Sequence, residues 1–75
     1  MLGMTRHEKY RRLRALRADR HWTQLQLALK AKVTQSRISL IENGYADPTE
    51  HERAAIAKAF QLPESEVFSS EALAS

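Results

Sequence analysis

The stretch TQSRISLIENG, residues 34–44, carries signals for both ends of a helix. Thr34 is a residue type favoured at a helix N-cap, where its hydroxyl can accept a hydrogen bond from a backbone N–H. Asn43 and Gly44 tolerate the positive φ at which many helices stop. The stretch therefore predicts a short helix over residues 34–43.

The two sides of this predicted helix differ in chemistry. At 100° per residue, Ile38, Ile41 and Glu42 share one side, which suits an inner edge packed on the domain. The opposite side and its flanks carry short polar side chains, one guanidinium and one leucine. These outward residues are Ser36, Arg37, Ser39, Leu40 and Asn43. A helix that only filled a core would not need this hydrogen-bonding outer surface.

The rest of the chain predicts an all-α fold, a compact bundle of four to five short helices. Only two glycines and two prolines occur, and helix-forming residues dominate. We expect a first helix over residues 5–20, with Tyr10, Leu13 and Leu16 facing inward. A second helix should begin after Thr23, with Trp22 packing back on it as a hydrophobic staple.

Two further helices are expected after residue 44. Thr49 should cap one that runs to residue 60, with an apolar stripe of Ile56, Ala59 and Phe60 and with Ala55 beside it. Pro63 suits the first position of a short last helix, and the tail, residues 69–75, is expected to be frayed. The chain of 75 residues thus predicts one domain.

Composition excludes several function classes. The chain has no cysteine, so neither disulfides nor a Cys-based zinc site is expected, and we expect no cofactor. His7, His21 and His51 show no metal-ligand spacing, and no nucleophile–base set appears, so no catalytic residue and no enzyme activity is predicted. No apolar run is long enough to span a membrane. A cytoplasmic protein without membrane contact is the expectation.

Charge is distributed unevenly along the chain. Residues 1–40 contain ten lysines and arginines against two acidic residues, a net charge of +8, whereas residues 41–75 contain two against seven, a net charge of −5. The basic half favours a polyanionic partner. Solvated helix faces whose charges merely cluster are the alternative interpretation.

A longer string around the opening stretch resembles a known family. WTQLQLALKAKVTQSRISLIENG, residues 22–44, is similar to the helix-turn-helix of the phage-repressor (Cro/cI-like) DNA-binding family, and the similarity covers residues 10–68. The resemblance implies a lambda-repressor-like domain with the helix-turn-helix over residues 23–43. It also implies that the second motif helix lies in the DNA major groove while the first crosses the backbone.

The resemblance assigns base contacts to the outer face of the helix at residues 34–43. Gln35 suits a bidentate contact with adenine, Arg37 suits guanine or a phosphate, and Leu40 suits a thymine methyl group. Ser36 and Ser39 are short enough for close approach and can donate to a base or a phosphate. Alternatives stay open: Gln35 and Ser36 as helix caps only, and Leu40 in a subunit contact.

Phosphate contacts are expected around this helix. The residues concerned are Thr23, Gln24, Lys32, Thr34, Asn43 and Tyr45. Lys32 stands where the family usually has glycine, so it must accept a positive φ or change the turn. The sequence does not show whether the basic residues of the first helix face DNA or solvent. These residues are Arg6, Lys9, Arg11, Arg12 and Arg14.

The family also pairs an arginine and a glutamate at the positions of Arg17 and Glu42. We therefore expect a largely buried salt bridge between these two residues, with a structural role. Leu25 and Leu29 stand where the family usually has charged residues, and they either extend the core or form an exposed apolar strip.

The resulting hypothesis is a transcriptional regulator, a repressor, that reads double-stranded DNA as a homodimer. Val67, Phe68 and Leu73 are the candidates for the dimer surface. Alternatives are a DNA-binding antitoxin of a toxin–antitoxin pair and a protein-interaction module with this fold. A protein partner is implied by both alternatives.

Overall fold

The computed structural model describes residues 10–68, and this part of the chain is built from α-helices without strands. The helices are α2 (Arg11–Asp19), α3 (Gln24–Ala31), α4 (Gln35–Glu42), α5 (Glu50–Phe60) and α6 (Glu64–Val67). The predicted all-α bundle of short helices is confirmed.

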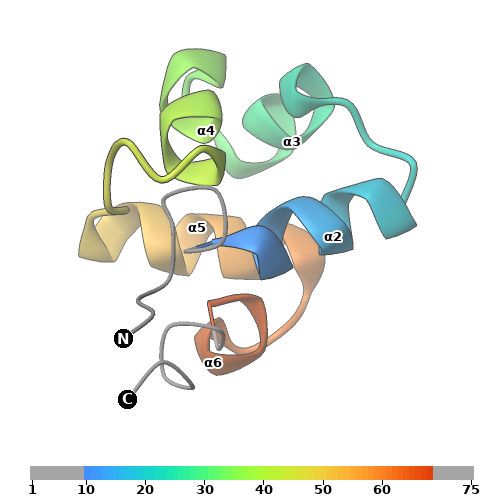
Figure 1. The fold of residues 1–75 in the computed structure, drawn as a ribbon. Helices are drawn as coiled ribbons and strands as arrows, with labels where there is room; N and C mark the ends of the chain where they lie inside the picture. The colour runs from blue at the N-terminus through green and yellow to red at the C-terminus, as the bar shows by residue number, and fades with distance from the viewer. Residues whose placement is uncertain (1–9, 69–75) are drawn as a thin grey trace, which may run out of the picture.

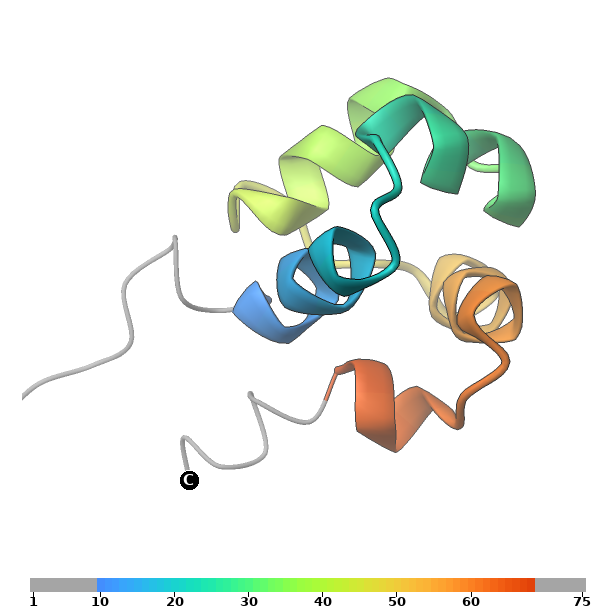
Figure 2. The same ribbon diagram turned by 90° about the vertical axis from the view of Figure 1, so that its right-hand side faces the viewer.

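The helices are arranged on the two sides of a central pair (Figure 1). In this view α3 and α4 lie above α2 and α5, and α6 lies below them. Figure 2 looks nearly along α2 and α5, which therefore run in similar directions. α3 packs against both α4 and α5, and α2 packs against α4 and α6. The helix-turn-helix formed by α3 and α4 thus sits on one side of the domain.

Threonine hydroxyls begin three of the helices, as predicted. The Oγ1 atoms of Thr23, Thr34 and Thr49 accept hydrogen bonds from the backbone N–H three residues later, at 3.0, 3.2 and 3.1 Å. Each such cap stabilises a helix start by about 1 kcal/mol. At the far end of α4, Gly44 has a φ of 77°, a region that glycine adopts without steric penalty.

Two helix boundaries differ from the prediction: Tyr10, inside the helix predicted over residues 5–20, is not helical, and Pro63 precedes the first helical residue of α6. The first described helix begins at Arg11, because Tyr10 has a non-helical φ of −124° and ψ of 37°. The Tyr10 hydroxyl donates to Asp47 Oδ1 at 2.6 Å, which ties the start of α2 to the loop after α4. Pro63 is the N-cap of α6 and not its first helical residue. The predicted start at Thr5 and the predicted frayed tail, 69–75, lie outside the described residues.

The core gathers apolar side chains from each helix in residues 10–68. Fully buried members are Leu13, Leu27, Ile38, Ile41, Ile56, Phe60 and Val67. Trp22 stacks on Phe60 at a ring distance of 5.1 Å, which closes the end of the bundle next to α3. Burying each large apolar side chain stabilises the fold by about 1.5–3 kcal/mol.

One prediction about the core surface is wrong. Val67 and Phe68 were expected at a dimer surface, but both are buried, and Phe68 packs edge-on against Tyr10 at 6.0 Å. They close the domain's own core and are not available to a second copy. On α5 the predicted stripe of Ile56, Ala59 and Phe60 packs on the core, with Ala59 half-buried, and Ala57 is a buried residue that the prediction did not include. The third candidate for the dimer surface, Leu73, lies outside the described residues.

Candidate nucleic-acid interface

The first helix of the motif, α3, begins with a capping box. Gln26 donates its backbone N–H to Thr23 Oγ1 at 3.0 Å, and its side-chain Oε1 accepts the Thr23 N–H at 2.8 Å. These reciprocal bonds satisfy two N–H groups that a helix end leaves open. The capping box thus fixes the residue at which α3 begins.

The turn between α3 and α4 is tight because Lys32 adopts a left-handed conformation, with φ 59° and ψ 40°. This conformation costs a non-glycine residue about 1–2 kcal/mol. It also lets the buried Val33 donate its N–H to Ala28 O at 3.1 Å. Of the two outcomes expected for a lysine at this position, acceptance of a positive φ is the correct one.

The inner face of α4 is anchored by a buried carboxylate. Glu42 is fully buried, and Arg17 donates to it through Nε at 2.6 Å and through Nη2 at 3.0 Å. The pair expected between Arg17 and Glu42 is thus present. Gln24 Nε2 is a third donor at 3.0 Å, and the Arg17 Nη1 atom donates to Trp22 O at 2.8 Å. The cluster joins α2, α3 and the last turn of α4.

Arg14 and Asn43 extend this cluster to the protein surface. The Arg14 Nη2 atom donates to Asn43 Oδ1 at 2.9 Å, and its Nε lies 3.8 Å from the Glu42 carboxylate. Asn43 Nδ2 in turn donates to Ser39 O at 2.9 Å. The two contacts of Arg14 were not predicted from the sequence, because a helical wheel places Arg14 on the side away from the core. A long arginine side chain at position i−3 from Arg17 can nevertheless reach the same partner.

The outer face of α4 forms one side of an open concavity. Four of the five residues predicted to contact bases line it together with Gln24 of α3: Gln35, Ser36, Ser39 and Leu40. Leu40 is 40% exposed, although it lies among polar neighbours. The two motif helices therefore present amide, hydroxyl and methyl groups on one continuous surface.

Arg37, the fifth residue predicted to contact bases, points elsewhere. Its Nε and Nη2 donate to the two carboxylate oxygens of Glu52 at 2.8 and 2.7 Å, and Nη2 also donates to Asp47 O at 3.2 Å. The Arg37 hydrogen bonds hold the pKa of the Glu52 carboxyl at about 2, against the opposing effect of burial. Glu52 in turn raises the pKa of Arg37. In this structure Arg37 ties α4 to α5 and does not line the concavity.

The residues predicted to contact phosphate differ in their exposure and in their hydrogen bonds. Thr23 and Thr34 are exposed at the starts of α3 and α4, where helix dipoles and free N–H groups favour an anion. Gln24 and Asn43 have amides engaged within the domain, and the exposed Tyr45 follows α4. Lys32 is exposed on the side of the turn that faces α5.

The structure also places several residues for which the sequence allowed two interpretations. Leu25 and Leu29 are 50% and 70% exposed, so the interpretation that they extend the core is wrong and they form an exposed strip. Arg12 donates its Nε to Glu66 O at 3.0 Å, which ties α2 to α6. Arg11 is exposed. Arg6 and Lys9 lie outside the described residues.

Two kinds of site are not found in the described part of the chain. Within residues 10–68, no group of three or more His, Cys, Asp or Glu side chains is arranged to hold a metal ion. None of the helices in the same range is both long and apolar enough to cross a bilayer.

Comparison with known proteins places this geometry in a family. A search of curated proteins and a search of solved structures found no match. A family model described as helix-turn-helix matches residues 13–67, which includes α3, the tight turn, α4 and the α5 that supports them. The family is of the Cro/cI type, and its members bind DNA. The chain therefore belongs to the Cro/cI-type helix-turn-helix family and is in general terms a DNA-binding regulator.

Proposed function

We propose that the protein is a sequence-specific transcriptional repressor that reads an operator through the major groove with α4. The observation that carries the proposal is the division of α4 into two faces. Glu42 and its partners lock the inner face, while the outer face lines an open concavity with Gln24. A helix held this rigidly presents its outer side chains in fixed positions, which direct readout of base edges requires.

The proposed roles follow from which side chains line the concavity. Gln35 stands in the first turn of α4 and carries the donor and acceptor pair that matches adenine N6 and N7. Ser36 and Ser39 supply hydroxyls for bases or phosphates, and Leu40 supplies an apolar contact for a thymine methyl group. Arg37 is reassigned: its bidentate bond to Glu52 supports a role in orienting α4, not in reading guanine.

Phosphate contacts are proposed for the exposed helix starts. Thr23 and Thr34 can offer backbone N–H groups and hydroxyls at the positive ends of α3 and α4. Tyr45 adds a hydroxyl beyond the end of α4, whereas Gln24 and Asn43 act mainly by positioning their neighbours. A single domain of this size contacts one half-site, so we propose a homodimer on a near-palindromic operator.

Salt dependence of binding to random duplex DNA tests the class of function. Each phosphate contact should contribute about −0.9 to the slope of log affinity against log salt concentration. Negligible affinity at low salt would contradict the proposal. It would favour the second candidate, a protein-interaction module, for which the exposed Leu25 and Leu29 are the supporting observation. A DNA-binding antitoxin would instead keep the salt slope and also bind a toxin.

Replacing Gln35 by alanine tests readout by α4. After the operator has been selected from a randomised DNA pool, Gln35→Ala should weaken operator binding by about 1–3 kcal/mol and relax selectivity at one base pair. Ser65→Ala, on the exposed surface of α6, is the matched control and should leave binding unchanged. An equal loss on operator and random DNA would place Gln35 on a phosphate instead.

A further inference from the structure

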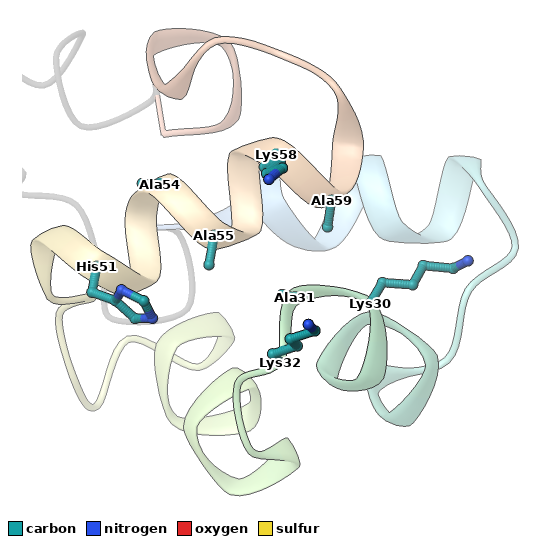
Figure 3. A pocket seen from close by; sticks show the side chains of 8 residues that line it. All are labelled: Lys30, Ala31, Lys32, His51, Ala54, Ala55, Lys58 and Ala59. Atoms are coloured by element: carbon teal, nitrogen blue, oxygen red, sulfur yellow. The ribbon is translucent and has the colours of Figure 1, made fainter.

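A second hollow lies between α3 and α5, apart from the concavity of α4. Its volume is about 590 Å³, and none of its lining residues belongs to α4. Buried and half-buried alanines form its floor, namely Ala31 at the end of α3 and Ala55 and Ala59 along α5, and the exposed Ala54 borders it. Figure 3 shows Ala55 and Ala59 projecting from α5 toward α3. Because alanine side chains are short, a partner's backbone can approach this groove closely.

The rim of the groove is cationic. Lys30, Lys32 and Lys58 line it together with His51, and no acidic residue does. Figure 3 places His51 near one end of the groove and Lys30 near the other. Residues 10–68 contain three lysines, Lys30, Lys32 and Lys58. Every lysine that the structure describes therefore borders this one groove.

The pairing of these lysines differs from that of the arginines. Five arginines of the described range form ion pairs with glutamates: Arg12, Arg14, Arg17, Arg37 and Arg53. Among residues 10–68 none of the three lysines has an acidic partner, and the Lys30 ammonium lies over the Trp22 ring at 4.9 Å. Lys32 also occupies a left-handed turn position that glycine would adopt at lower cost. The positive charge around the groove is therefore uncompensated within the described domain.

We propose that this groove binds an acidic amphipathic helix of a partner protein. Small apolar residues of that helix would pack on the alanine floor, and carboxylates on its two flanks would pair with Lys30, Lys32 and Lys58. Walls made of two helices suit a helix-in-groove arrangement, and charge complementarity selects an acidic partner. The apolar floor argues against DNA as the occupant, because a phosphate backbone offers it no apolar surface.

A displayed library of random peptides tests the proposal on the full chain. Enriched peptides should carry Asp or Glu beside Ala or Leu repeated at i, i+3 and i+4. A synthetic peptide from the selection should bind Lys30→Gln/Lys58→Gln at least about tenfold more weakly than the unmodified protein. Arg11→Gln, an exposed charge loss on α2, should leave its affinity within about twofold.

Blocking the groove gives a second readout, which does not require the replacement of a lysine. Ala54 is exposed, so Ala54→Glu should fold normally while placing a carboxylate at the groove, and peptide binding should be lost. Ala15→Glu, an equal change on the exposed side of α2, is its control and should bind as before. Circular dichroism of both variants verifies folding.

Three results would overturn the proposal. One is a selection that enriches no peptide or enriches peptides without acidic residues. Another is peptide binding that survives Ala54→Glu. The third comes from NMR titration with random duplex DNA alone: larger shifts at the groove than at α4 would assign the groove to phosphate binding.

Discussion

Two arginine–glutamate pairs hold opposite ends of α4, in very different surroundings. The Arg17–Glu42 pair lies at its last turn, where the Glu42 side chain is fully buried and that of Arg17 is 16% exposed. The Arg37–Glu52 pair lies at its first turn, with the two side chains 32% and 13% exposed. Both are bidentate, and their shortest N–O distances are 2.6 and 2.7 Å. Distance alone therefore does not distinguish them.

The difference lies in what each carboxylate loses when its partner is removed. Glu42 has no access to water, so its buried negative charge depends on the hydrogen bonds that Arg17 and Gln24 donate. Glu52 can recover some hydration, and the Thr49 N–H also donates to it at 2.9 Å. The buried pair thus fixes the position of α4 in the domain, and the outer pair adjusts the orientation of its first turn.

The largest expected effect comes from removing the buried carboxylate. Glu42→Ala leaves the guanidinium of Arg17 without its partner, and we expect a loss of about 3–5 kcal/mol in the free energy of unfolding, measured by urea denaturation. Glu50→Ala, an exposed change at the start of α5, should lose about 0.5 kcal/mol. Similar losses in the two variants would show that the buried Arg17–Glu42 pair contributes no more to stability than an exposed charge does.

An intermediate effect is expected when the geometry changes but the charge stays. Arg17→Lys cannot donate to both Glu42 oxygens and to Trp22 O at once, so we expect about 1–3 kcal/mol of lost stability. The same exchange at Arg37 should lose less, since water can replace the missing donors there. An equal loss at both positions would mean that burial does not govern the strength of these pairs.

The smallest effect is expected at Glu52, and it should depend on pH. Glu52→Gln should lower stability by about 1 kcal/mol at neutral pH, less than the ~3 kcal/mol to which a pKa shift from 4.5 to about 2 corresponds, because solvent screens the partly exposed Arg37 side chain. Because Arg37 lowers the pKa of Glu52 from 4.5 to about 2 in the folded state, the pair's contribution is complete above pH 4.5. It is lost as the pH falls from 4.5 toward 2.

Urea denaturation of the two proteins between pH 7 and pH 2 measures this dependence. The unmodified protein and Glu52→Gln should therefore differ by a constant amount above pH 5 and should converge below it. A difference that persisted at pH 2 would show that the Glu52 carboxylate does not act through its charge.

Local signals in the sequence predicted more of the fold than of the contacts. The threonine caps of α3, α4 and α5 were predicted because a cap depends on residues within one turn. The Arg17–Glu42 pair was expected from the family resemblance. The Arg37–Glu52 pair was missed because its partners are 15 residues apart and meet only through the path of the loop between α4 and α5.

Burial at the end of the domain was harder to predict than helix boundaries. Val67 and Phe68 were placed on a dimer surface. A helix of four residues is too short for a repeating apolar pattern to show which side faces inward. On α5 the predicted stripe was incomplete, because Ala57 is buried as well as Ile56 and Phe60. Such errors arise where tertiary packing, and not the local sequence, decides which side chain is covered.

The two faces of α4 have a consequence for how a protein of this kind can change. Gln35 and Ser36 lie exposed on the outer face, away from the anchors at Glu42 and Glu52. Substitutions at these positions alter the chemistry of the surface while leaving the hydrogen bonds that position the helix intact. A descendant of this sequence can therefore be directed to a new partner by a few substitutions among the eight residues of α4, without a change of fold.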